Sequence, residues 1–173
     1  MRPQFEVHDR ETVLQRVRRE AVRIGRRLHA TEPLPVYTTT IERLAKSQSL
    51  AEAAQHVAWM SLIVVGDDPI AAVEVETTEH RVSTEFEHVP TAIASALAVG
   101  ERTVSDKFTI DDVALLKVGQ IGVIAIWIRT AALLVPLRLR SNRREFEPNR
   151  PYGEDAFVAA AAAAAARIAT SAR

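Results

Sequence analysis

The stretch IGVIAIWI, Ile121–Ile128, decides the fold class, because it is apolar at both odd and even positions. A strand in a sheet with one wet face would instead alternate apolar and polar residues. Two arrangements would remove both faces of this strand from water. Helices cover both faces of its sheet, or helices cover one face and a second subunit covers the other. We favour the second subunit, with the first and last helices as further candidates for the interface.

The segments on either side of this stretch also read as strands. DVALLKV (112–118) precedes it and ALLVPLR (132–138) follows it. Gly119-Gln120 predicts a two-residue hairpin loop with glycine in the first position. Pro136 has no N–H to donate to a ladder, so we expect the last of these strands at an edge of the sheet.

Three further strands are predicted upstream. WMSLIVV (59–65) and IAAVEVE (70–76) flank the turn sequence GDDP and predict a β-hairpin. RVSTEFE (81–87) predicts a third strand. Pro90 then opens a helix that runs through TAIASALAVGERT (91–103), since proline is well tolerated at a helix start.

Helices are predicted at both ends of the chain. Asp9–Ala30 reads as a long helix, followed by a break at Pro33 and Pro35. Thr39 or Thr40 caps a short helix, IERLAK, and Ser49 caps another, LAEAAQHVA. The final helix, Glu154 to Ala169, is rich in alanine, the strongest helix former.

This order of elements predicts an α+β fold. We expect a mostly antiparallel sheet of about five or six strands packed with about three to five helices. The length of 173 residues suggests a single domain over residues 1–173. Its parts are a helical segment (9–58), a sheet-forming segment (59–139) and a C-terminal helix (153–170).

Composition narrows the class of protein. The net charge is zero and there is no cysteine, so disulfides, thiolate catalysis and cysteine-bound zinc are excluded. The N-terminus does not resemble a signal peptide, and the longest uncharged apolar run is shorter than the ~20 residues of a membrane span. We expect a cytoplasmic bacterial protein with no cofactor and no membrane partner. Zero net charge argues against nucleic acid as a general partner.

The acidic stretch VEVETTEHRVSTEFEH (73–88) raises the question of a metal site. A register consistent with its alternation sets Val73 opposite Phe86 and Glu74 opposite Glu85. Carboxylates would then gather on one face of the hairpin, and the metal candidates are Glu74, Glu76, Glu85 and Glu87. A solvated acidic face is the interpretation we favour, with an acidic docking surface as a further alternative.

Two arginine clusters are candidates for anion binding, one on the first helix and one in the loop before the last helix. The candidates are Arg16, Arg19, Arg23, Arg26, Arg27, Arg140, Arg143 and Arg144. Solvated arginine side chains that cover apolar neighbours are the simpler interpretation. An anion or nucleic-acid binder requires the two clusters to merge into one patch.

The absence of a nucleophile elbow, a phosphate-binding loop and a dinucleotide-binding fingerprint favours a non-enzymatic function. We expect an interaction or assembly module that self-associates or docks on a larger protein. The interface candidates are the apolar residues of the two-sided strand and of the first helix: Ile124, Ile126, Trp127, Ile128, Leu14, Val17, Ile24 and Leu28. The alternative is an enzyme with a carboxylate-based or metal-assisted site on the Glu74–Glu87 hairpin.

Overall fold

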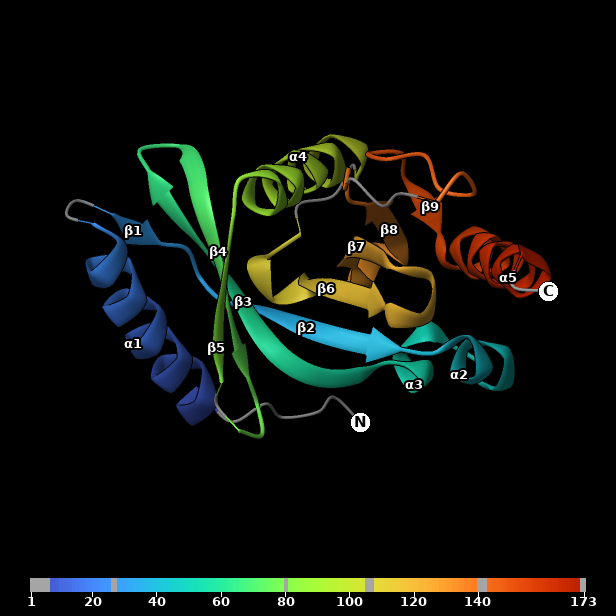
Figure 1. The fold of residues 1–173 in the computed structure, drawn as a ribbon, viewed down its shortest axis with the longest axis horizontal. Coiled ribbons are helices and arrows are strands. Elements are labelled where there is room, and N and C mark those ends of the chain that lie inside the picture. The colour runs from blue at the N-terminus through green and yellow to red at the C-terminus, as the bar shows by residue number, and fades with distance from the viewer. Residues whose placement is uncertain (1–6, 26–27, 80, 105–107, 140–142, 172–173) are drawn as a thin grey trace.

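A computed structural model describes residues 7–25, 28–79, 81–104, 108–139 and 143–171 of the chain (Figure 1). Within these residues, nine strands form one sheet in the order β5-β4-β3-β2-β6-β7-β8-β9, and β1 pairs with β3 beside β2. Only β2 and β6 pair in parallel among the described strands. The predicted α+β class with a mostly antiparallel sheet is confirmed, and the sheet is larger than predicted.

The strands, in chain order, are β1 (His29–Ala30), β2 (Leu34–Thr39), β3 (Gln55–Val65), β4 (Asp68–Glu76), β5 (Val82–Phe86), β6 (Val113–Val118), β7 (Val123–Ile128), β8 (Leu133–Pro136) and β9 (Tyr152–Gly153). The α-helices are α1 (Val7–Ile24), α2 (Ile41–Lys46), α3 (Leu50–Ala53), α4 (His88–Thr103) and α5 (Glu154–Ser171). Single 3₁₀ turns precede β6, β7 and β8. None of the described helices is long and apolar enough to cross a membrane.

Helices cover both faces of the sheet. Helix α1 packs on β3 and β4 through Val17 and its neighbours, and α5 packs on β6, β7 and β8 through Phe157 and its neighbours. The strand registers place these two clusters on the same face, which we call the first face. Helix α4 covers the opposite, second face through Ile93. Figure 1 shows α1 and α5 at opposite ends of the sheet, with α4 along one side.

Strand β7 contains most of the stretch Ile121–Ile128, which is apolar on both faces. It lies between β6 and β8, with Trp127 under α5 and Ile128 under α4. Both side chains are buried within the chain, because the apolar residues of β7 meet a helix on each face. The first of the two predicted arrangements is therefore the one observed, and our preference for a second subunit at this strand was wrong.

The hairpin predictions hold in outline. Strands β3 and β4 pair around a tight turn at Gly66, whose φ of 61° suits glycine. Strands β6 and β7 also form the predicted hairpin. Their loop differs from the prediction: a 3₁₀ turn over Gly119–Ile121 is followed by Gly122 at φ 65°, so Gly122 provides the left-handed residue.

The N-terminal third contains the largest corrections. Helix α1 ends at Ile24, and His29–Ala30 form β1 instead of continuing the predicted helix. The segment Leu34–Thr39, which we expected to be a break between helices, is the central strand β2. Pro35 is tolerated there because the pairing with β6 begins only at the next residue, Val36.

The short helices begin where the sequence predicts. The Arg43 N–H donates to the Thr40 hydroxyl at 3.2 Å, and the Glu52 N–H donates to the Ser49 hydroxyl at 3.3 Å. The second of them, α3, ends at Ala53, far earlier than predicted, because β3 begins at Gln55. The segment expected to be the end of a helix is therefore the start of the longest strand.

One consequence concerns His56, which the sequence placed on a helix. It lies on β3 between the rings of Tyr37 and Trp59, with centroid distances of 5.4 and 4.9 Å. Tyr37 in turn contacts Trp127 edge-on at 5.7 Å. Burial raises the pKa of the Tyr37 hydroxyl. The rings of Tyr37, Trp59 and Trp127 are buried in the core.

Strand β8 is not the edge that Pro136 predicted. It pairs with β7 on one side and with the two-residue strand β9 on the other. Strand β9 pairs only with Leu133 and Leu134, so Pro136 lies beyond it and its missing N–H leaves that ladder intact. Among the described strands, the sheet therefore ends at β9 on one side and at β5 on the other.

Candidate interaction surface

Strand β5 forms one edge of the sheet. It pairs with β4 along its whole length, from Ala71 opposite Phe86 to Val75 opposite Val82. No described strand pairs with its outer side. An unpaired strand edge presents a row of free N–H and C=O groups, which is a template for another strand.

The hydrogen bonds to β4 fix which backbone groups are free. The Glu76 N–H donates to the Arg81 carbonyl at 2.9 Å, one step beyond the end of the β4–β5 register. Hydrogen-bonded and non-hydrogen-bonded pairs alternate along an antiparallel ladder. The odd-numbered residues Ser83 and Glu85 therefore direct their backbone groups at β4. The backbone groups that point outward are those of Val82, Thr84 and Phe86.

The side chains of β5 alternate between the two faces. Val82, Thr84 and Phe86 share the first face with Val73 and its neighbours under α1, whereas Ser83 and Glu85 lie on the second face. Val82 is 40% exposed and Phe86 is 49% exposed. Two of the five strand residues are thus large apolar side chains at the open edge of the sheet.

Helix α1 supports β5 from the first face. The Thr84 hydroxyl donates to Glu20 Oε1 at 3.1 Å, and the Arg23 guanidinium contacts the same carboxylate. The hydrogen bond from Arg23 lowers the pKa of Glu20, and the bond from Thr84 adds to this while partial burial opposes it. Thr84, in the middle of the strand, is therefore held to the helix by a carboxylate that stays charged.

Charged residues flank the strand at both ends. Arg81 precedes it and contacts the carboxylates of Glu79 at 2.5 Å and Glu76 at 3.7 Å. Glu87 follows it with φ 63° and ψ −101°, a turn that takes the chain off the sheet and into α4. Both charged side chains are largely exposed, so the edge is bounded by a cation at one end and an anion at the other.

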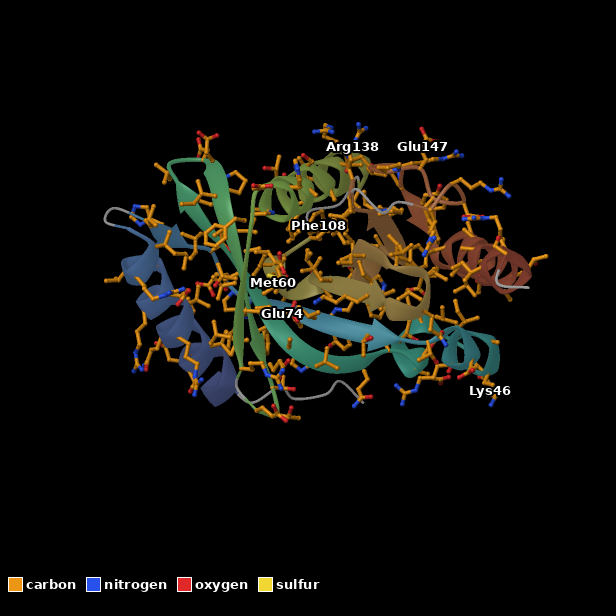
Figure 2. All side chains as sticks on the ribbon, viewed as in Figure 1. Lys46, Met60, Glu74, Phe108, Arg138 and Glu147 are labelled. Carbon is orange, nitrogen blue, oxygen red and sulfur yellow. The ribbon has the colours of Figure 1, made fainter. Side chains whose placement is uncertain are left out.

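The structure does not bring the predicted metal candidates together. Strand pairing sets Glu74 opposite Ser83 and Val73 opposite Thr84, two residues away from the predicted register. Glu74, which Figure 2 labels, forms an ion pair with Lys117 of β6, across two intervening strands. Among the described residues, no group of three histidine or acidic side chains is placed to hold a metal ion.

The interface candidates of the sequence lie mostly inside the molecule. On β7, Ile126, Trp127 and Ile128 are buried and Ile124 is partly buried against the cluster under α4. On the first helix, Leu14 and Val17 are buried. Ile24, and Leu28 beyond the helix end, pack against the cluster under α1. Most of these side chains contribute to the core of one chain, which leaves little of their surface for a partner.

The arginine candidates do not form one patch. Arg16, Arg19 and Arg23 lie on α1, over β3 and β4, whereas Arg143 and Arg144 follow β8 toward the opposite end of the sheet. The guanidinium of Arg143 donates to the Ile121 carbonyl, and Arg144 contacts Glu145. Arg26, Arg27 and Arg140 are outside the described residues. The condition set for an anion-binding surface is therefore not met by the described arginines.

Clefts on the described surface are shallow or small. One hollow of about 410 Å³ lies between the first turns of α4 and the segment after β8, lined by His88, Thr91, Ser95, Arg138 and Asn149 among others. Another, of about 530 Å³, lies between α1 and β1 and is lined by Ala21, Val22 and Leu28 among others. Neither contains a paired acid and base.

Only part of the β5 surface has a local signal in the sequence. The alternation in RVSTEFE predicted the strand correctly. Its position at the edge follows from the strand order, which depends on pairing between distant segments and has no local pattern. Val82 and Phe86 share the face of Val73 and stay partly exposed because they lie at the open edge of the sheet.

Comparison with known proteins found no matching family model, no matching curated protein and no matching solved structure.

Proposed function

We propose that this protein is an interaction module that binds an extended polypeptide strand along the open edge of its sheet at β5. The observation that carries the proposal is the outer side of β5, where the backbone groups of Val82, Thr84 and Phe86 are unpaired by any described strand. Binding by strand addition obtains affinity from main-chain hydrogen bonds and specificity from alternate side chains.

The composition of the edge supports this function. Proteins usually protect an edge strand by making it very short, by placing proline or lysine on it, or by covering it. Strand β5 has five residues, contains neither proline nor lysine, and all but Thr84 are exposed. Its two apolar side chains provide the contacts that backbone pairing alone lacks.

A proline substitution can remove one outward N–H of β5 without disturbing the pairing between β5 and β4. In Thr84→Pro the lost N–H is one that points away from β4, where proline is tolerated in an edge strand. Thr84→Val is the matched control, because it also loses the hydroxyl bond to Glu20 but keeps the N–H. Thermal melts of both variants confirm that each one folds.

The ligand for this test comes from a displayed library of random peptides selected on the immobilised full-length chain. We expect selected peptides to bind Thr84→Val like the wild type and Thr84→Pro at least about tenfold more weakly, which corresponds to roughly 1.4 kcal/mol. Hydrogen exchange should slow at the amides of Val82, Thr84 and Phe86 when peptide binds. Equal binding to both variants, protection at another surface, or a failed selection would contradict the proposal.

A further inference from the structure

We infer that the strand bound at this edge is β5 of a second copy of the chain, antiparallel, with Thr84 of one copy opposite Thr84 of the other. This inference rests on the proposed function, because it uses the same outer side of β5. It adds the identity of the partner, the direction of its strand and the register of pairing.

The backbone permits this register. In an antiparallel ladder, residues that exchange both hydrogen bonds lie directly opposite each other. The outward-directed residues of β5 are the even-numbered ones, so even-numbered residues of the two copies must oppose one another. With Thr84 on the twofold axis, Thr84 meets Thr84 and Val82 meets Phe86 of the other copy. All the outward N–H and C=O groups of both strands are then paired.

The side chains match in the same register. On the first face, β-branched Val82 lies opposite aromatic Phe86 of the other copy, twice across the axis. On the second face, the Ser83 hydroxyl lies opposite the Glu85 carboxylate. Beyond each end of the joined strands, Arg81 of one copy comes beside Glu87 of the other, at the turn into α4. Aromatic with β-branched, threonine with threonine, and opposite charges are the favourable cross-strand pairs.

The neighbouring registers match less well. Moving the axis to Glu85 sets the two Glu85 carboxylates directly opposite each other, which is destabilising. Moving it to Ser83 sets Glu87 opposite Glu79 and leaves Phe86 without an apolar partner. The register centred on Thr84 is also the one that uses all five strand residues, Val82–Phe86, of both copies.

Helix α1 leaves room for the second copy. When the two β5 strands pair, the β4 strands of the two copies are three strand spacings apart, which is about 14 Å. Helix α1 lies over β3 and β4, so the α1 helices of the two copies are separated by more than the ~8–10 Å of packed helices. The space between them takes Val82 and Phe86 of both copies. Helix α4 runs from the edge toward β7 and β8 on the second face.

The sequence permits a direct measurement of the register, because the chain has no cysteine. Three single-cysteine variants, Thr84→Cys, Ser83→Cys and Glu85→Cys, are oxidised with glutathione disulfide, and the disulfide-linked dimer is followed on a non-reducing gel. Each cysteine meets its own copy only when the axis passes through that residue. We expect Thr84→Cys to cross-link fastest, since residues opposed in a hydrogen-bonded pair have Cα atoms about 5.5 Å apart.

Charge reversal tests the ends of the strand. Native mass spectrometry over a dilution series gives the dimer dissociation constant of the wild type, Arg81→Glu, Glu87→Arg and the double variant. We expect each single reversal to weaken the dimer about tenfold, and the double to recover to within about threefold of the wild type. Arg81 also contacts Glu76 and Glu79 of its own chain, and Arg81→Glu loses these contacts whether or not Glu87 is reversed as well. Recovery therefore isolates the contact between copies, and Arg150→Glu is the remote control.

The outcomes separate the inference from the function on which it rests. A dimer lost in Thr84→Pro and kept in Thr84→Val, with fastest cross-linking at residue 84, supports both. If Thr84→Pro loses the dimer but the cysteine variants cross-link faster through residue 83 or 85, only the register is overturned. The same holds if the dimer does not respond to charge reversal. A dimer unchanged in Thr84→Pro overturns the inference and counts against the edge as a binding site. A protein that stays monomeric at all concentrations overturns the second copy, while the peptide selection decides the function independently.

Discussion

The two edges of this sheet differ in how they end. Strand β9 has only two residues, follows Pro151 and leads directly into α5. Its Tyr152 contacts Phe146, and the Arg150 guanidinium lies 5.7 Å from the Tyr152 ring centroid. Strand β5 has five residues, no proline and two exposed apolar side chains. The β9 edge is closed: it is protected because the strand is very short and its own chain packs beside it. The β5 edge is open and can still pair with another strand.

This difference separates residues that stabilise the fold from residues that are available to a partner. At the closed end, the aromatic side chain of Phe157 on α5 is fully buried against the sheet. At the open end, an aromatic side chain of the same type, Phe86, is half exposed. Substitutions at the two ends should therefore affect different quantities, unfolding in one case and association in the other.

The largest effect is expected from this pair of phenylalanines. Phe157→Ala removes a ring packed 5.0 Å from Phe146 and should lower the free energy of unfolding by about 3–5 kcal/mol. Phe86→Ala should lower it by less than about 1 kcal/mol in the monomer, because half of its surface is already in water. Urea unfolding of dilute protein measures both values. Similar losses for the two variants would show that β5 is packed against something at this edge.

The next effect concerns the alanines of α5, which lie against the closed half of the sheet. Ala161 is fully buried, whereas Ala162 is exposed on the same helix. Ala161→Leu should overpack the contact with the sheet and cost about 1–3 kcal/mol. Ala162→Leu should change the free energy of unfolding by no more than about 0.5 kcal/mol. Equal values from chemical denaturation would mean that α5 does not lie closely on the sheet.

The core of this closed half could be predicted from the sequence, because its signals are local. Strands β6, β7 and β8 were predicted from short apolar runs, and α5 from its alanine run. The two short helices were predicted from single capping residues, Thr40 and Ser49. Each of these signals acts over a few residues, so one sequence contains it in full.

The features that were missed depend on distant partners. Pro33 precedes strand β2 and Pro35 lies within it, and the segment becomes a strand through its pairing with β3 and with β6, which is almost 80 residues away. The same is true of β1, which pairs with the end of β3. The edge position of β5 is a property of the whole sheet, which explains why the sequence predicted the strand and not its exposed outer side.

The next effect on stability is expected from the ion pair that spans the open half of the sheet on its second face. Lys117 of β6 meets Glu74 of β4, and both side chains are mostly buried. Lys117→Met should leave the Glu74 carboxylate without its partner and cost about 1–2 kcal/mol. The double variant Lys117→Met with Glu74→Leu should regain most of this loss, because an apolar pair needs no compensating charge. Thermal melts of both variants measure the recovery, and an unchanged single variant would show that the pair is fully solvated.

The smallest effect depends on pH and belongs to the closed end. Arg167 of α5 holds Glu145 in a bidentate contact, which is the main reason that the pKa of Glu145 falls from 4.5 to about 2. A carboxyl group whose pKa is lower in the folded chain stabilises the fold above its unfolded pKa and stops doing so as pH falls toward its folded pKa. The contribution should therefore be present at neutral pH and be lost between about pH 4.5 and pH 2.

Glu145→Gln tests this dependence against Glu147→Gln, an exposed neighbour in the same segment. The melting temperature of Glu145→Gln should lie below that of the wild type at pH 7, and the difference should shrink as the pH falls from about 4.5 toward 2. The control should follow the wild type at every pH. A constant difference would mean that Glu145 acts through packing instead of charge. The segment before β9 would then be fixed by its aromatic contacts, and the closed edge would owe its protection to Phe146 and Tyr152.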